Sequence, residues 1–119
     1  MPEKLDPTAV DRLLEMSGGD REFVGELIDE YLSDAPGQIA ALRDATGDEL
    51  VRAAHTLKST SATFGAARLA AICSELERAA RHGDRHADLV AGAEGEYAEV
   101  RPALESERER IRIVEGRQP

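Results

Sequence analysis

The chain has 119 residues and a formal net charge of −9 at pH 7, a length that favours one domain with a modest core. Hydrophobic residues make up 41% and charged residues 33%, which is typical of a globular protein rather than a disordered one. An acidic chain without a basic stripe is a poor candidate for binding nucleic acid or an anionic membrane surface.

The rarer residue types narrow the class of protein further. A single cysteine excludes an internal disulfide, and aromatic residues are only 3%, so the core must be mostly aliphatic. No apolar run approaches the roughly 18 residues of a membrane span, and residues 1–4 do not resemble a signal peptide. These features predict a cytoplasmic protein, and the initiating Met favours a free-standing chain.

The first predicted helix has an explicit start signal. Asp6 is expected as its N-cap, with Pro7 at the first helical position, where a missing N–H costs nothing. Leu5 and Val10 are then spaced as a hydrophobic staple across the helix start. The run Ser17-Gly18-Gly19 is expected to end the helix.

A longer second helix is expected to begin after Asp20 as its N-cap. Apolar residues at helical spacing predict its buried face: Phe23, Val24, Leu27, Ile28, Tyr31, Ala35, Ile39 and Leu42. Because this spacing runs straight across Pro36, we expect one helix with a bend at the proline rather than two helices. Gly47 breaks the pattern, and Asp48 is expected to cap the next helix.

The third helix presents a histidine away from its apolar face. The buried face is predicted from residues three and four apart: Leu50, Ala54, Leu57, Ser61 and Phe64. At about 100° per residue, His55 points away from that face, on the same side as Lys58, Ser59 and Ala62. An exposed imidazole with a lysine neighbour suits a task in which another protein's active site reaches the ring. The alternative is a surface histidine without a function.

Two further helices complete the chain. Gly65 is expected to end the third helix, and a fourth helix is expected over about 66–81, followed by Gly83. The last helix is expected to start near His86, with a bend at Pro102. The charged segment 105–119 either continues this helix through i,i+4 ion pairs or frays.

Four long amphipathic helices with short loops predict an all-α fold, an antiparallel up-down four-helix bundle with a short extra N-terminal helix. We expect more than about half of the residues to be helical and no sheet. No internal repeat or linker interrupts residues 1–119, so they are expected to form a single domain, and a self-contained bundle favours a monomer.

The segment Ala54-His55-Thr56-Leu57-Lys58-Ser59 carries a family resemblance, together with residues at fixed distances after it: Gly65, Leu69, Cys73, Leu76 and Glu77. This pattern resembles the histidine-containing phosphotransfer (HPt) domain. Upstream, the similarity also includes Phe23, Tyr31 and Asp34-Ala35-Pro36, and it covers roughly residues 5 to 105. Ser59 departs from the family, since many members carry Gly there; serine is also small, so little consequence is expected.

The resemblance implies a phosphorelay intermediate. His55 would accept a phosphoryl group from a receiver-domain aspartate and pass it to another receiver, with Lys58 supporting the transfer or the docking. Residues near the histidine are expected to meet the partner: Arg52, Thr56, Ser59 and Ala62. Gly65 is expected to have a structural role. The implied partners are receiver domains of response regulators and a hybrid sensor kinase.

The chain lacks the sequence features of a kinase. It has no Gly-rich nucleotide loop and no P-loop, and Thr56 follows His55 where the dimerisation domains of sensor kinases usually carry an acidic residue. We therefore expect a phosphoryl carrier rather than an enzyme, without a cofactor of its own. Magnesium is expected on the partner receiver domain.

The alternative function is a four-helix interaction module that binds a partner without carrying phosphate. His82 and His86 are four residues apart, a spacing that can bind metal on a helix, but Gly83 lies between them and no third ligand is evident, so no metal site is expected. Cys73 lies on an apolar face and is expected to be a buried, inert thiol.

Overall fold

A computed structural model of the chain describes residues 4–84 and 86–116, with side chains to residue 112. It contains five α-helices: α1 (Ala9–Met16), α2 (Arg21–Asp44), α3 (Gly47–Thr63), α4 (Ala67–Arg81) and α5 (Ala87–Gly116). None of the described residues lies in a β-strand. The predicted all-α fold is therefore confirmed.

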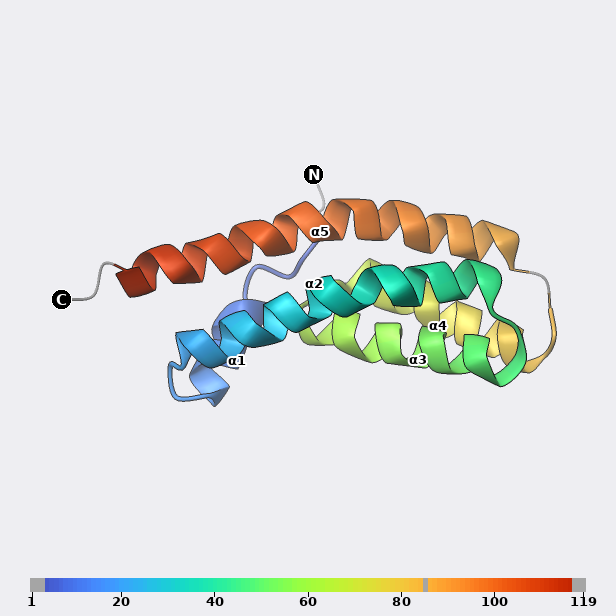
Figure 1. Cartoon of the computed structure of the whole chain (residues 1–119), viewed down its shortest axis with the longest axis horizontal. Helices are drawn as coiled ribbons and strands as arrows, with labels where there is room; N and C mark the ends of the chain where they lie inside the picture. The colour runs from blue at the N-terminus through green and yellow to red at the C-terminus, as the bar shows by residue number, and fades with distance from the viewer. Residues whose placement is uncertain (1–3, 85, 117–119) are drawn as a thin grey trace.

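Helices α2 to α5 form an antiparallel bundle in which each helix packs on the next and α5 returns to α2 (Figure 1). The short helix α1 packs against α2 at one end. Helix α5 is longer than its neighbours, and its C-terminal half extends past α3 and α4 to the end of the molecule where α1 lies (Figure 1). The long axis of the molecule, 55 Å, reflects this extension.

One continuous apolar core joins all five helices, and its central residues are fully buried: Val24, Ile28, Leu42, Leu57, Leu69, Leu76 and Leu104. Leu5 and Val10 are both buried in this core, but the predicted staple was wrong, because with Thr8 as the N-cap they do not lie at the N′ and N4 positions of α1. The prediction for Phe23 was wrong, because its side chain is 49% exposed. Val24 takes the buried position at this turn of α2, and Phe23 lies about 100° around the helix from it.

Two predicted N-caps were wrong, because the structure has each cap at a nearby threonine instead. Helix α1 begins at Ala9, with Thr8 as its N-cap, while the Asp6 carboxylate accepts hydrogen bonds from the backbone N–H (2.9 Å) and hydroxyl (2.7 Å) of Thr8. Asp6 thus caps the turn that precedes the helix. The N-cap of α3 is Thr46, so Asp48 lies inside the first turn, where a carboxylate interacts favourably with the helix dipole.

Both proline-containing helices continue through their prolines. Asp20 accepts the Phe23 N–H at 2.9 Å, as predicted for the N-cap, and α2 then runs unbroken past Pro36 to Asp44. Helix α5 likewise runs past Pro102 to Gly116. The bends expected at the two prolines stay predictions, whereas the charged segment after Leu104 continues the helix over its described part.

The C-terminal half of α5, which extends past α3 and α4, contacts α1 and α2. The Arg108 guanidinium binds the Asp29 carboxylate of α2, with Nε 3.1 Å from Oδ1. Arg110 binds Asp11 of α1 at 2.9 Å and Glu107 on its own helix at 3.0 Å. Ile111 is only 1% exposed. The extension therefore adds core at the end of the molecule that α3 and α4 do not cover.

The connection between α3 and α4 fixes the end of α3 tightly. Gly65 has φ +80°, and the N–H groups of Gly65 and Ala66 donate to the carbonyls of Ala62 and Ser61, the two bonds of a Schellman motif. The Gly65 carbonyl in turn accepts the Asp6 N–H at 2.9 Å. A Cβ on Gly65 would lie 2.8 Å from the Cβ atoms of Asp6 and Ala9. The segment before α1 thus packs directly on this glycine.

Candidate functional site

Helix α3 separates a buried face from an exposed one, and His55 lies on the exposed face. Ala54 and Leu57, its neighbours at −1 and +2, are fully buried in the bundle. The His55 side chain is 59% exposed. The core therefore fixes the helix, while the imidazole stays accessible to another molecule.

A carboxylate from the adjacent helix α4 holds the His55 ring. Glu77 Oε2 lies 3.2 Å from His55 Nδ1 and 2.9 Å from the Arg81 guanidinium. Its other oxygen, Oε1, accepts a 2.7 Å hydrogen bond from Lys58. Glu77 is only 7% exposed, so this carboxylate is a buried anion between one imidazole and two cations.

The surroundings of Glu77 keep it ionised. Hydrogen bonds from Arg81 and then from Lys58 lower the pKa of Glu77 from its ordinary value of 4.5 to about 2, against the opposing effect of burial. At neutral pH the group is therefore a carboxylate that only accepts hydrogen bonds. The contact with His55 then requires the ring to carry its proton on Nδ1.

This contact leaves the second ring nitrogen of His55 for chemistry. With the proton on Nδ1, the lone pair of the neutral ring is on Nε2. Over the described part of the chain, no group hydrogen-bonds to Nε2. A carboxylate on one nitrogen also fixes the tautomer and the orientation of the ring. The arrangement is that of an oriented, exposed nitrogen nucleophile.

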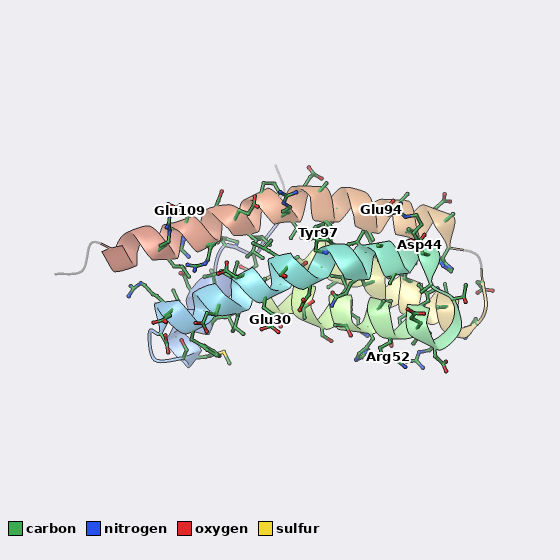
Figure 2. All side chains as sticks on the ribbon, viewed as in Figure 1. Glu30, Asp44, Arg52, Glu94, Tyr97 and Glu109 are labelled. Atoms are coloured by element: carbon green, nitrogen blue, oxygen red, sulfur yellow. The ribbon has the colours of Figure 1, made fainter. Side chains whose placement is uncertain are left out.

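The other residues predicted around the histidine lie on the same helix in different environments. Lys58 is 31% exposed and its ammonium is paired with Glu77, so it is held beside His55 rather than free in solvent. Arg52, Ser59 and Ala62 are exposed, and Thr56 is half-buried. Figure 2 shows Arg52 on α3 at the edge of the bundle that faces away from α5.

Sequence reasoning did not assign a role to Glu77 or Arg81. A signal was present, because Glu77 follows Leu76 in the row of apolar positions that includes Leu69 and Cys73. A charged residue on a buried helix face needs partners of opposite charge. That rule predicts a cation near Glu77, but not that the carboxylate also contacts His55.

The remaining histidines lie away from this cluster, where α4 ends and α5 begins. His82 is the C-cap of α4, and His86 Nδ1 contacts the Asp84 carbonyl oxygen at 2.9 Å. The described residues hold no group of three side chains suited to a metal ion. They also include no helix with the length and apolar content of a membrane span. Cys73 is fully buried, and burial raises the pKa of its thiol to about 12.

The chain was compared with protein-family models, curated proteins and solved structures. The Hpt domain model matches residues 26–112. The crystal structure of histidine-containing phosphotransfer protein B (HptB) from Pseudomonas aeruginosa PAO1 is 31% identical in sequence, with a TM-score of 0.78. The match covers 92% of this chain and 98% of that one. A comparison with curated proteins gave no match. The chain therefore belongs to the Hpt domain family, and its function is histidine phosphotransfer in a phosphorelay.

Proposed function

We propose that His55 is the residue that carries the phosphoryl group, and that Nε2 is the atom that binds it. The observation that supports this assignment is the contact between His55 Nδ1 and the Glu77 carboxylate. It turns the free nitrogen toward solvent, on the face of α3 opposite to the core residues Ala54 and Leu57.

The transfer step follows from this arrangement. The Nε2 lone pair attacks the phosphorus of a receiver-domain aspartyl phosphate, an N–P bond forms, and the P–O bond to the aspartate breaks. The aspartate leaves as a carboxylate. The phosphorylated ring keeps its Nδ1 proton and gains positive charge, which the Glu77 carboxylate at 3.2 Å compensates. The reverse attack by a second receiver's aspartate restores neutral His55.

Lys58 and Arg81 have a double role in this proposal. Both cations bind Glu77 in the resting protein, at 2.7 Å and 2.9 Å, and so fix the carboxylate that orients His55. Both also bring positive charge beside the ring, where the equatorial oxygens of the transferring phosphoryl group are negative. Lys58 is thus a supporting residue, which assists transfer without forming the bond.

The chain acts in this proposal as a carrier and not as an enzyme. The partner receiver supplies the aspartate and the magnesium ion, and Arg52, Thr56, Ser59 and Ala62 lie where a receiver docked over His55 would contact α3. We propose a monomer that serves response regulators, with a hybrid sensor kinase as a further partner. The cytoplasmic location expected from the sequence stays a prediction.

Phosphoryl labelling tests the assignment. Incubation with a phosphorylated receiver and magnesium should label the chain, and the label should be acid-labile and base-stable, as expected of an N–P bond. His55→Gln should fold normally, still bind the receiver and take no label. His82→Gln, an equally conservative change at an exposed histidine, is the matched control and should be labelled at the normal rate.

Two results would contradict the assignment. Undiminished labelling of His55→Gln would place the phosphoryl group on another residue. Failure of every receiver of the source organism to label the unmodified chain would instead favour an interaction module that does not carry phosphate.

A further inference from the structure

A hollow of about 470 Å³ lies on α5, on the flank of this helix that faces α2. Residues on one side of α5 line it: Glu94, Tyr97, Ala98, Arg101, Pro102 and Glu105. Glu94 also reaches α2 through an ion pair with Arg43 at 3.2 Å. Figure 2 shows Tyr97 between α5 and α2, whereas Arg52, on the helix that carries His55, faces away from α5. The hollow is therefore separate from the histidine site.

The hydroxyl of Tyr97 has no hydrogen-bond partner among the described residues. Tyr97 is only 8% exposed, so this hydroxyl has also lost its contact with bulk water. A buried polar group in that state is unfavourable. The neighbouring ring, Tyr31, differs, because its hydroxyl pairs with Ser61 at 2.9 Å. Tyr97 therefore has an unused hydrogen bond to offer.

Arg101 and Glu105 lie close to this hydroxyl. Burial raises the pKa of Tyr97, and the charge of Arg101 lowers it while that of Glu105 raises it. Arg101 Nε is 3.4 Å from Glu105 Oε2, and the two side chains are 63% and 51% exposed. Exposed ion pairs are weak, so each side chain can exchange its partner for a ligand at little cost. The hydroxyl, which keeps its proton at neutral pH, is then open to a ligand in the hollow.

The hollow also offers hydrogen-bond acceptors. Pro102 has no N–H, so the Ala98 carbonyl lacks the donor that residue i+4 supplies elsewhere in a helix. Ala98 is exposed and lines the hollow. The carboxylates of Glu94 and Glu105 place negative charge at its two ends along α5. One side of a single helix thus presents donors and acceptors together.

We propose that this hollow binds a small zwitterion of the α-amino acid class. The carboxylate of the ligand accepts hydrogen bonds from the Tyr97 hydroxyl and the Arg101 guanidinium. Its ammonium donates to the Ala98 carbonyl and pairs with Glu105. A ligand with only a negative charge would face Glu94 and Glu105, and one with only a positive charge would leave the hydroxyl unpaired. The volume lies within the range of small-molecule sites, about 300–1,000 Å³.

An NMR titration of the ¹⁵N-labelled chain tests the site, with L-leucine as the probe up to about 50 mM. Saturable shifts are expected at the backbone amides of residues 94–105. N-acetyl-L-leucine has only the negative charge and L-leucinamide only the positive one. Each should bind at least about tenfold more weakly than L-leucine, because each satisfies only half of the site.

Two variants test the residues that bind the carboxylate. Tyr97→Phe removes only the hydroxyl and should weaken L-leucine binding about tenfold. Its melting temperature should not fall, because the hydroxyl has no partner in the unliganded chain. Arg101→Gln should also weaken binding. Arg112→Gln is the matched control, since Arg112 is an exposed arginine paired with a glutamate of the same helix, and it should keep the affinity within about twofold.

The proposal goes beyond phosphotransfer, so His55→Gln should bind L-leucine as the unmodified chain does. The absence of saturable shifts at residues 94–105 would overturn the proposal. Equal affinity for L-leucine and either singly charged analogue would also overturn it, because the site would then not recognise a zwitterion. A lower melting temperature of Tyr97→Phe, with unchanged binding, would show that the hydroxyl bonds to water and takes no part in ligand recognition.

Discussion

The Nδ1 atom of His55 lies 3.2 Å from Oε2 of Glu77, a residue 22 positions later and on a different helix. Because Glu77 also binds Lys58 and Arg81, one carboxylate joins the histidine to both nearby cations. The geometry of the site therefore depends on how α4 packs on α3, and not on α3 alone.

Glu77→Gln should weaken transfer through the orientation of His55. The amide has similar size but no charge, and it can present either an oxygen or an N–H to the ring, so the Nδ1–H form loses its preference. We expect labelling to slow by roughly tenfold. Nitrogen NMR of His55 should show the Nδ1–H form in the unmodified chain and a mixture of the two forms in the variant. Transfer at the original rate with an unchanged NMR spectrum would show that Glu77 has only a structural role.

The same carboxylate predicts a pH dependence of stability. The pKa of Glu77 is lowered from 4.5 to about 2 in the folded protein, so its ion pairs stabilise the fold fully above the ordinary pKa. This contribution is lost as the pH falls below 4.5 toward about 2. Urea unfolding should therefore show a larger stability difference between the unmodified chain and Glu77→Gln at about pH 7 than at about pH 3. A difference that stays constant with pH would contradict the prediction.

Alanine substitutions at Gly65 and Gly83 distinguish the free-energy cost of a positive φ from the cost of close packing. Both have positive φ, +80° and +70°, but only at Gly65 would a Cβ meet other atoms within 3 Å. Gly83→Ala should destabilise by about 1 kcal/mol through backbone conformation alone. Gly65→Ala should cost about 2–3 kcal/mol, since the segment from Asp6 to Ala9 must also shift. Equal losses of unfolding free energy for the two variants would show that the packing contributes nothing.

Ala62→Trp and Ser59→Trp test whether the surface near His55 must stay open. Both residues are exposed, so the melting temperature should change little. Transfer from the receiver should nevertheless slow, because a bulky ring two turns or one turn from His55 obstructs docking. Ala98→Trp, at an exposed position of α5, is the control and should transfer normally. A normal rate for Ala62→Trp would place this residue outside the docked surface.

The extension of α5 predicts a change in stability without a change in activity. Ile111 is 1% exposed, and Ile111→Ala should destabilise by about 2–4 kcal/mol. The exposed neighbour Arg112→Ala should cost little. Below the melting temperature, both variants should label at the normal rate, because α3 and α4 do not depend on that end of the bundle for the geometry at His55. Slower labelling of folded Ile111→Ala would contradict this independence.

The sequence was sufficient to predict the helices because their apolar residues recur at helical spacing. The order of the elements, the exposed face of α3 and the glycine that follows it were all predicted on that basis. Helix starts were less certain, because Thr46 and Asp48 both suit an N-cap and local sequence does not choose between them. Phe23 was misplaced for a related reason: next to Val24, either residue satisfies the apolar spacing, and only the packing of α2 decides.

The partner of His55 could not be predicted from the sequence. Helical spacing predicts which face of each helix is buried, one helix at a time. The contact between His55 and Glu77 depends instead on how α4 is rotated about its axis and shifted along it relative to α3. The same limitation applies to the ion pairs of Arg108 and Arg110, which join α5 to α2 and α1. Charged residues at the end of a helix are equally compatible with a solvated, frayed tail.

The two faces of α3 have a consequence for how signalling pathways diverge. Ala54 and Leu57 hold the helix in the core, whereas Arg52, Ser59 and Ala62 are exposed around His55, and no position belongs to both sets. Exposed substitutions cost little folding free energy. After a gene duplication, two copies of such a carrier can therefore acquire different receivers through a few surface changes, without first losing the fold or the histidine.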